Sequence, residues 1–169
     1  MKKYFPRFSF FFILIVVLTG CAQTKQYTPK PIGTQYRLEG MPSDIVRVQV
    51  NDLRAEKETS EQLIQAIKGQ ILSALSPKKI AGDRSLYNLQ IDIIEHRSFF
   101  TLGNWNASTK FRIKLIDPEK IIIGNWRAEG EAYRSNMRGY ITAKAVSQDA
   151  YNIAVADMMS TLSAVSLVK

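Results

Sequence analysis

The sequence contains very little of the two residue types from which most metal and redox sites are built. Among its 169 residues there are one cysteine and one histidine. A single cysteine cannot form an intramolecular disulfide, and one cysteine with one histidine is too small a ligand set for a zinc site. The sequence also lacks a phosphate-binding loop, a nucleophile elbow and a dinucleotide-binding fingerprint. We therefore expect no metal, no cofactor and no catalytic residues.

The apolar run near the N-terminus is too short to cross a membrane. From Phe8 to Leu18 ten of eleven residues are apolar, whereas a membrane-spanning helix needs about 20. Three basic residues precede the run: Lys2, Lys3 and Arg7. A basic start followed by a short apolar run is typical of a secretory signal peptide. Residues 1–20 are therefore predicted to be a signal peptide.

The residues Leu18-Thr19-Gly20-Cys21 follow this run directly and resemble the lipobox of bacterial lipoproteins. In a lipobox a small residue precedes a cysteine that receives diacylglycerol on its thiol, is freed by cleavage and is acylated again on its new amino group. We therefore expect cleavage between Gly20 and Cys21 and lipidation of Cys21. The alternative is a signal anchor with an incidental cysteine. Ala22, where enterobacterial lipoproteins retained in the inner membrane have Asp, implies the outer membrane by this resemblance.

Removal of the signal peptide lowers the formal net charge from +8 to +5, since three basic residues and no acidic ones are lost. An exported and tethered protein should not meet nucleic acid, and no nucleic-acid-binding motif is present. Two or more acyl chains give stable membrane anchoring. The expected partners are the outer membrane, through the lipid, and a protein of the cell envelope.

The mature chain divides into a polar start and one domain. Residues 22–43 carry three prolines and show no sustained hydrophobic period. We interpret 21–43 as the lipidated N-terminus and a tether, of which Tyr36, Leu38 and Met41 are candidates for packing on the domain. Residues 44–169 are predicted to form a single α+β domain.

Two hydrophobic periods alternate along this domain. Alternating apolar residues predict strands at 46–50 and 87–93, and apolar residues at helical spacing predict helices over 63–75 and about 141–166. Thr59 and Gln62 are a candidate capping box for the first helix. Together with a hairpin over 105–132, the order is β-α-β-β-β-α. It predicts a two-layer sandwich, with a mainly antiparallel sheet and both helices on one face.

The hairpin has the most specific predicted register. Asp117-Pro118-Glu119-Lys120 is a favourable turn sequence. Pairing Ile116 with Ile121 places Phe111 opposite Trp126 and Lys110 opposite Arg127. A slip of one residue would expose every apolar side chain.

Parts of the chain resemble the YajG family of proteobacterial lipoproteins. The resemblance is carried by the lipobox, the element order and three segments: Tyr87-Asn88-Leu89-Gln90-Ile91, Asn106-Ala107-Ser108-Thr109-Lys110 and Ile153-Ala154-Val155-Ala156-Asp157-Met158. The layout is also similar to that of other envelope lipoproteins, including the lipopolysaccharide-assembly plug protein. The resemblance implies an accessory or binding role and transfers no catalytic residue.

Two sets of residues are candidate catalytic groups. His96 would need a nucleophile and an orienting carboxylate within hydrogen-bond reach, so a histidine at the surface or at a strand end is the favoured interpretation. Glu129 and Glu131 share a strand face and could act as an acid/base pair. Charge pairing with Lys110 and Arg127 is favoured for them.

Two surfaces are candidates for binding. Aromatic and apolar residues crowd the connection between the second and third strands, where a loop should be polar, and could contact lipid or a partner: Phe99, Phe100, Leu102 and Trp105. The alternative is that the strands run longer and these residues cap the core. The uncovered sheet face carries four basic residues and could bind an anionic ligand: Lys110, Arg112, Lys114 and Arg127. The alternative there is an ordinary solvated face.

The sequence therefore predicts a non-enzymatic outer-membrane lipoprotein that acts as an accessory or binding module of the cell envelope. The alternative is an auxiliary lipoprotein of a lipid or lipopolysaccharide transport system that handles lipid directly. A third interpretation, a hydrolase, would depend on His96 or Glu129.

Overall fold

The computed structural model describes residues 25–33, 36–55, 59–77, 86–136 and 141–167. The predicted signal peptide and the lipidation residues Gly20 and Cys21 lie outside the described residues. Four strands form the main sheet in the order β2-β4-β5-β6, and two helices accompany them. The bounds are β2 Val46–Asp52, α2 Ser60–Ala74, β4 Tyr87–Thr101, β5 Asn104–Ile116, β6 Ile122–Ser135 and α3 Ala143–Ser163.

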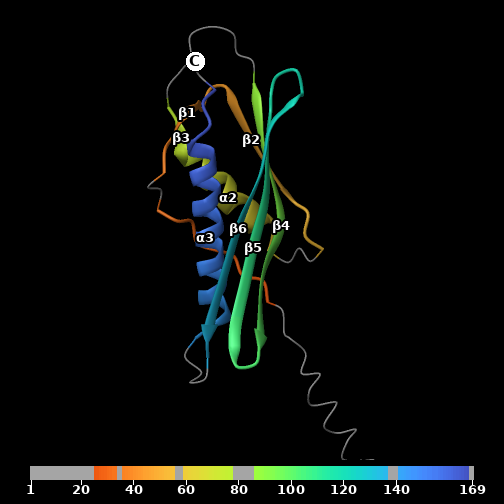
Figure 1. The fold of residues 1–169 in the computed structure, drawn as a ribbon, viewed down its shortest axis with the longest axis vertical. Coiled ribbons are helices and arrows are strands. Elements are labelled where there is room, and N and C mark those ends of the chain that lie inside the picture. Colours follow the sequence, from red (N-terminus) through yellow and green to blue (C-terminus); the bar gives the residue numbers. More distant parts are fainter. Residues whose placement is uncertain (1–24, 34–35, 56–58, 78–85, 137–140, 168–169) are drawn as a thin grey trace, which may run out of the picture.

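The fold is the predicted α+β two-layer sandwich. Strand β2 runs parallel to β4, whereas the β4–β5 and β5–β6 pairs are antiparallel. Both helices lie on the same face of this sheet (Figure 1). A two-stranded parallel sheet was not expected; it pairs β1 (Leu38–Pro42) with β3 (Leu75–Ser76).

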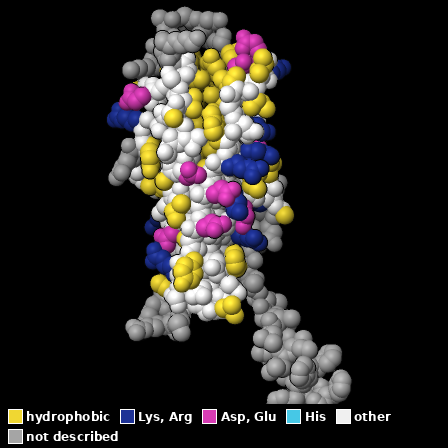
Figure 2. Space-filling model, in the orientation of Figure 1, with side chains coloured by type: hydrophobic (Ala, Val, Ile, Leu, Met, Phe, Trp, Pro, Cys, Tyr) yellow, Lys and Arg dark blue, Asp and Glu magenta, His cyan; other side chains and the backbone are white. Residues whose placement is uncertain are grey.

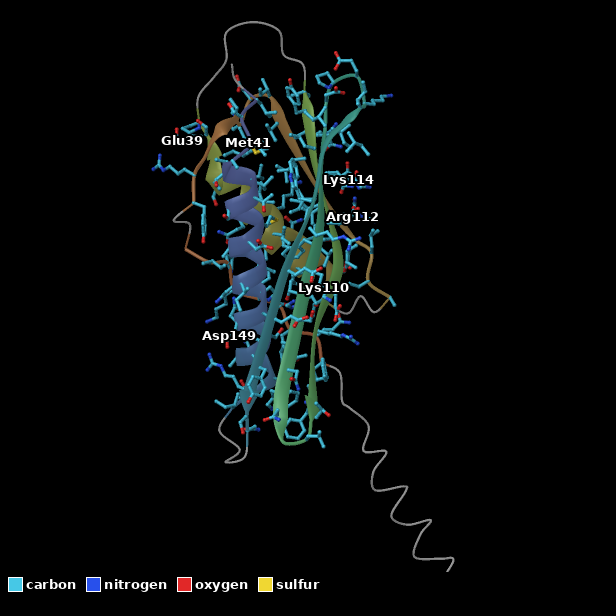
Figure 3. The ribbon with its side chains drawn as sticks, in the orientation of Figure 1. Glu39, Met41, Lys110, Arg112, Lys114 and Asp149 are labelled. Atoms are coloured by element: carbon cyan, nitrogen blue, oxygen red, sulfur yellow. The ribbon has the colours of Figure 1, made fainter. Side chains whose placement is uncertain are left out.

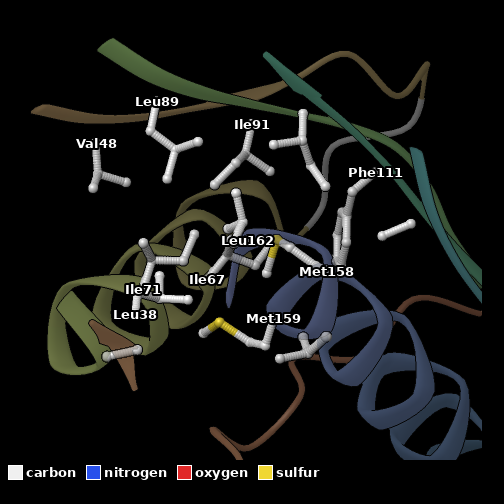
Figure 4. Close-up of a cluster of buried hydrophobic side chains, with 14 of the residues drawn as sticks. Leu38, Val48, Ile67, Ile71, Leu89, Ile91, Phe111, Met158, Met159 and Leu162 are labelled. Carbon is white, nitrogen blue, oxygen red and sulfur yellow. The ribbon is translucent and has the colours of Figure 1, made fainter. Parts of the chain in front are cut away.

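The core fills the space between the sheet and the two helices (Figure 4). Leu89 and Ile91 of β4 and Phe111 of β5 are completely or almost completely buried against Met158 and Leu162 of α3. Helix α3 lies close to β6 at Gly130. A Cβ atom at this position would collide with the backbone of Ala150 and Ala154. The small residue is therefore required by the close packing of helix on strand.

Helix α2 begins at the predicted place but without the predicted capping box. Thr59 is its N-cap residue, and no side-chain hydrogen bond caps the helix there. The buried Thr59 hydroxyl has no hydrogen-bond partner among the described residues. The Thr59–Gln62 capping box is therefore wrong.

The predicted register of the β5–β6 hairpin is wrong by two residues, although the faces are right. Phe111 pairs with Ala128, and Lys110 pairs with Glu129. The connection is one residue longer than assumed, since Ile116 pairs with Ile122, and an irregularity between Leu115 and Ile116 adds the second residue of the shift. Asp117 and Ile121 close the connection by a backbone hydrogen bond of 2.9 Å, and Lys120 adopts a φ of 68°. Side chains alternate with a period of two, so a shift of two residues leaves each side chain on its predicted face.

A bulge in β4 changes which residues face the helices. The pairing of β4 with β5 is interrupted between Ile93 and Glu95, leaving Ile94 as the extra residue. Before the bulge the odd-numbered residues Leu89, Ile91 and Ile93 are buried. After it the even-numbered residues His96 and Ser98 are buried instead. A bulge inserts one unpaired residue and so reverses the alternation downstream.

The polar N-terminal segment lies on the domain from Lys25 onward. Strand β2 pairs with β4 only as far as Ile93, so the second half of that edge of β4 has no strand partner among the described residues. Lys25 fills the place through two backbone hydrogen bonds with Ser98, of 2.8 and 3.0 Å. Farther along, Leu38 and Met41 are fully buried, as the sequence suggested. The division into a tether (21–43) and a domain (44–169) stays a prediction.

Candidate functional site

The first predicted surface lies at the tip of the β4–β5 hairpin, where the connection is only two residues long. Thr101 pairs with Asn104, so Leu102 and Gly103 alone make the turn. Both residues have a positive φ, 49° at Leu102 and 78° at Gly103. This combination matches a type I′ hairpin turn. The Leu102 side chain projects from the turn and is 95% exposed.

The structure brings together only some of the four apolar residues predicted for this region. Phe100 and Trp105 are a cross-strand pair with ring centroids 5.1 Å apart. Trp105 also packs against a small cluster beneath α3, whereas Phe100 remains 38% exposed. Phe99 lies on the other face, under the guanidinium of Arg97 at 5.6 Å. The strands therefore do run longer than expected, and Trp105 covers part of the core.

The second predicted surface is the sheet face turned away from the helices, here called the open face. Lys110, Arg112 and Lys114 lie in a row along β5 on this face (Figure 3). Arg112 and Lys114 lie beside Asp92 of β4, whose carboxylate accepts two hydrogen bonds from Arg112 at 3.0 and 3.1 Å. The Lys114 ammonium lies 3.9 Å from the same carboxylate.

Asp92 is a buried carboxylate at the centre of this face, with only 1% of its surface exposed. Burial acts to raise its pKa, but hydrogen bonds from Asn51, Gln90 and Arg112 act against it and hold the pKa below its ordinary value. Asp92 is therefore ionised at neutral pH and neutralises part of the positive charge around it.

A second carboxylate pairs with the remaining cations of β4 and β5. Glu95 contacts Arg97 at 2.7 Å and Lys110 at 3.8 Å. Arg127, opposite Arg112 on β6, makes no ion pair with any described residue. Positive and negative side chains alternate over the molecular surface (Figure 2). The open face is thus a mixed-charge surface on which Arg127 is an exposed cation.

His96 is not at the surface or at a strand end, as was expected, but buried in the middle of β4. It is 1% exposed, because the bulge at Ile94 turns it toward α3. Its Nδ1 lies 2.9 Å from the Thr109 hydroxyl and its Nε2 lies 2.8 Å from the Tyr27 carbonyl oxygen. A carbonyl only accepts, so Nε2 carries the proton and Nδ1 accepts from Thr109.

The surroundings of His96 favour its neutral form. Burial lowers the pKa of His96, and the nearby Arg54 guanidinium acts in the same direction, against the opposing effects of the Tyr27 carbonyl and Asp52. Arg54 is itself buried and forms a bidentate pair with Asp52, at 2.7 and 2.9 Å. Burial raises and the Arg54 hydrogen bonds lower the pKa of Asp52, with a net result of about 2.

Among the described residues, this buried polar cluster exposes no hydroxyl beside His96. The Ser147 hydroxyl lies 3.4 Å from His96 Nε2, but Ser147 is only 2% exposed and Nε2 is already bonded to Tyr27. An adjacent cleft of about 310 Å³ is lined by polar and charged residues together with two small or apolar ones: Gln26, Arg54, Ala55, Ile94, Glu95, His96 and Arg97. Within the described ranges no group of three metal-ligating side chains comes together. The cluster instead attaches the N-terminal segment to the domain.

The two candidate acid/base glutamates are exposed on β6. Glu129 lies opposite Lys110 and Glu131 lies opposite Ser108. The backbone N–H of Glu129 donates to the Asp157 carboxylate at 3.1 Å. Asp157 is exposed and lies outside the buried face of α3, at the side that meets the outer edge of β6. Both glutamates are therefore on the solvent side of an edge strand, with a cation opposite Glu129.

Most of the residues that organise the buried cluster carry no signal in the sequence. Arg54 follows β2 outside any hydrophobic period, and Tyr27 contributes a backbone carbonyl rather than its side chain. Thr109 does occupy a core-facing position of β5, where a hydroxyl predicts a buried hydrogen-bond partner.

Comparison with known proteins gives no family assignment. No protein-family model and no curated protein match the chain. A solved structure of a putative lipoprotein from Caulobacter crescentus is 15% identical, covering 68% of this chain and 84% of that one with a TM-score of 0.40. A putative neuraminyllactose-binding hemagglutinin homolog from Helicobacter pylori is 8% identical, covering 82% and 90% with a TM-score of 0.44. Likeness at this level says nothing about activity.

Neither helix in the described part of the chain has the length and hydropathy needed to cross a bilayer.

Proposed function

We propose that this protein is a bacterial lipoprotein, anchored to the outer membrane through acylated Cys21, and that its domain is a non-enzymatic accessory or binding module of the cell envelope. The observation that carries the proposal is the basic start, short apolar run and lipobox in uninterrupted order before Cys21. The resemblance to the YajG family supports the same role.

The interior of the domain supports binding rather than catalysis or lipid carriage. His96 and Ser147 are buried, and both His96 nitrogens have partners. Carriage of an acyl chain would require an apolar cavity, but Met158 and Leu162 are fully buried and pack directly against the sheet. The open face, with its exposed Arg127, and the hairpin tip are the surfaces available for partners.

Lipidation is tested by mass spectrometry of the mature protein and by separation of inner and outer membranes. We expect an N-terminal peptide that starts at Cys21 with diacylglycerol and an amide-linked acyl chain, in the outer-membrane fraction. The Cys21→Ser variant should remain uncleaved, and Ala22→Asp should be lipidated but retained in the inner membrane. An unmodified Cys21 in the wild-type protein would contradict the proposal.

The accessory role is tested by mild cross-linking in intact cells, followed by purification and mass spectrometry of proteins and lipids. We expect to recover a stoichiometric protein partner and to lose it in Arg127→Glu, a variant of the open face. Bound phospholipid without a protein partner would favour the alternative of direct lipid handling. Hydrolase activity that disappears in Glu129→Gln would contradict the non-enzymatic role.

A further inference from the structure

The direction of the chain at Lys25 relates the lipid anchor to the hairpin tip. Lys25 pairs antiparallel with Ser98 through two backbone hydrogen bonds. Two residues later, the Tyr27 carbonyl lies beside His96, which is two residues earlier in β4. The chain from Lys25 to Tyr27 therefore runs away from the tip, so the N-terminal end of this segment, at Lys25, is directed toward the tip.

The distance that this chain can cover is limited. Three residues lie between Cys21 and Lys25, so the Cα atoms of these two residues can be at most about 14 Å apart. Three residues also lie between Ser98 and Leu102, whose Cα atoms are about 13 Å apart along a strand. While Lys25 is bound to Ser98, Cys21 can therefore reach along the strand only to about the level of Leu102.

We propose that the hairpin tip, through Phe100, Leu102 and Trp105, inserts into the interface of the membrane leaflet that holds the acyl chains of Cys21. This insertion rests on the proposed lipidation. An acylated Cys21 lies at the membrane interface, and its short connection to Lys25 brings the tip to the same depth. The domain then stands with the β4–β5 hairpin directed at the membrane (Figure 1).

The composition of the tip fits this environment. Leu102 is 95% exposed and occupies a left-handed conformation that costs a leucine about 1–2 kcal/mol and that asparagine or glycine adopts more readily. Neither the turn nor the core requires a leucine there. Trp105 and Phe100 form an aromatic pair just behind it, and aromatic rings of this kind concentrate at membrane interfaces. Hydrophobic side chains are visible at this end in Figure 2.

A second exposed apolar group lies at the opposite end of the hairpin and is excluded from the membrane by the same geometry. Ile121, Ile122 and Ile123 are 51–60% exposed at the β5–β6 turn. The length of β5 places them roughly 40 Å from the tip, well beyond the reach of Cys21. The position of the anchor therefore discriminates between two apolar surfaces of the same molecule.

The two tryptophans of the chain provide matched reporters for the experiment. Trp126 pairs with Ile113, eight residues along β5 from Trp105 and about 27 Å away. The Trp126→Phe variant retains Trp105 alone, and Trp105→Phe retains Trp126 alone. Each mature, lipidated variant is reconstituted in vesicles of phosphatidylethanolamine and phosphatidylglycerol, with or without bromine on the acyl chains, because bromine quenches tryptophan fluorescence only at short range.

We expect the brominated vesicles to reduce Trp105 fluorescence about twofold or more and to leave Trp126 fluorescence nearly unchanged. Leu102→Asn should keep the fold, because Asn-Gly is favoured in this turn, but should remove most of the quenching of Trp105. Equal quenching of both tryptophans, or none at Trp105, would overturn the inference. The inference would also be overturned if a protein were cross-linked to the tip in stoichiometric amount while Trp105 stayed unquenched. The tip would then bind that protein and not the membrane.

Failure of the anchor and failure of the tip give different results. Mass spectrometry and vesicle flotation report on the lipid at Cys21, independently of tryptophan quenching. A protein without the lipid would contradict the proposed function and, with it, this inference. A lipidated, vesicle-bound protein with unquenched Trp105 would overturn the inference alone.

Discussion

Replacement of His96 by phenylalanine tests the role of the buried histidine directly. Phenylalanine keeps the ring against Tyr151, which contacts the His96 ring edge-on at 6.2 Å, but it removes both hydrogen bonds. The Thr109 hydroxyl and the Tyr27 carbonyl each lose a partner. An unsatisfied buried polar group costs about 1–3 kcal/mol. Because Tyr27 is only partly buried, we expect the free energy of unfolding at pH 7 to fall by about 2–4 kcal/mol.

The pH dependence of this effect has a definite sign. Burial lowers the pKa of His96 in the folded protein, so below about pH 6.5 the unfolded chain binds the proton first. Stability is then fully present above pH 6.5 and decreases as the pH falls, by at most about 1.4 kcal/mol per pH unit for one proton. The His96→Phe variant lacks this dependence between pH 7 and 5, so the difference between the two proteins should narrow in acid.

Two measurements check this prediction. Urea unfolding at pH 7, 6 and 5 gives the free energies of both proteins. NMR titration gives the pKa of His96 without assignment ambiguity, since the chain has one histidine. The carboxylates Asp52 and Asp92, whose pKa values are lowered, titrate well below this window. A folded-state pKa of 6.5 or higher, or equal pH slopes in both proteins, would refute the assigned burial and hydrogen bonding.

Three further predictions concern stability. Gly130→Ala should lower the free energy of unfolding by about 1–3 kcal/mol, because the added Cβ would meet the backbone of α3. Gly69→Ala, measured in the same denaturation assay, should raise it by about 0.5–1 kcal/mol, because the space around Gly69 in α2 is open. Tyr151→Phe should increase the free energy of unfolding by about 1 kcal/mol, because the buried hydroxyl has no partner among the described residues. The melting temperature should rise accordingly, whereas a lower melting temperature would reveal a partner. Asp92→Asn should cost about 1–3 kcal/mol at pH 7. Because the pKa of Asp92 is lowered, the stability that its carboxylate gives the wild-type protein is lost as the pH falls below about 4. Parallel acid-unfolding curves for the wild-type protein and Asp92→Asn would contradict this lowered pKa.

The faces of the β5–β6 hairpin could be read from the sequence, but its register could not. An alternation with a period of two determines only whether a residue lies on one face or the other. Phe111 therefore faces the core whether it pairs with Trp126, as predicted, or with Ala128, as observed. The register depends on the turn, where Lys120 adopts a positive φ, and on the irregularity between Leu115 and Ile116. Lysine at that position carries no signal of such a conformation.

The position of His96 was beyond sequence reasoning for a different physical reason. The apolar alternation from Leu89 stops at Ile93, and no glycine or proline follows to mark where the strand becomes irregular. The bulge at Ile94 is favoured by the second half of β4, since it turns Ser98 and Phe100 as well as His96 toward the helices. Only the complete set of contacts, including the Tyr27 carbonyl from a distant segment, favours this arrangement over the regular one.

The unequal lengths of β2 and β4 explain why a polar, proline-containing segment is ordered against the domain. Beyond Ile93 the edge of β4 presents backbone groups without a strand partner, and such an edge is a site for pairing. Lys25 satisfies the N–H and carbonyl of Ser98, and the Arg54 guanidinium, at 3.3 Å, satisfies the carbonyl of His96. Because Lys25 covers this edge, only three residues lie between it and Cys21, the proposed site of lipidation. With Cys21 acylated as proposed, the Lys25–Ser98 hydrogen bonds would limit the distance between the domain and the membrane, and loss of this pairing should release the hairpin tip from the bilayer.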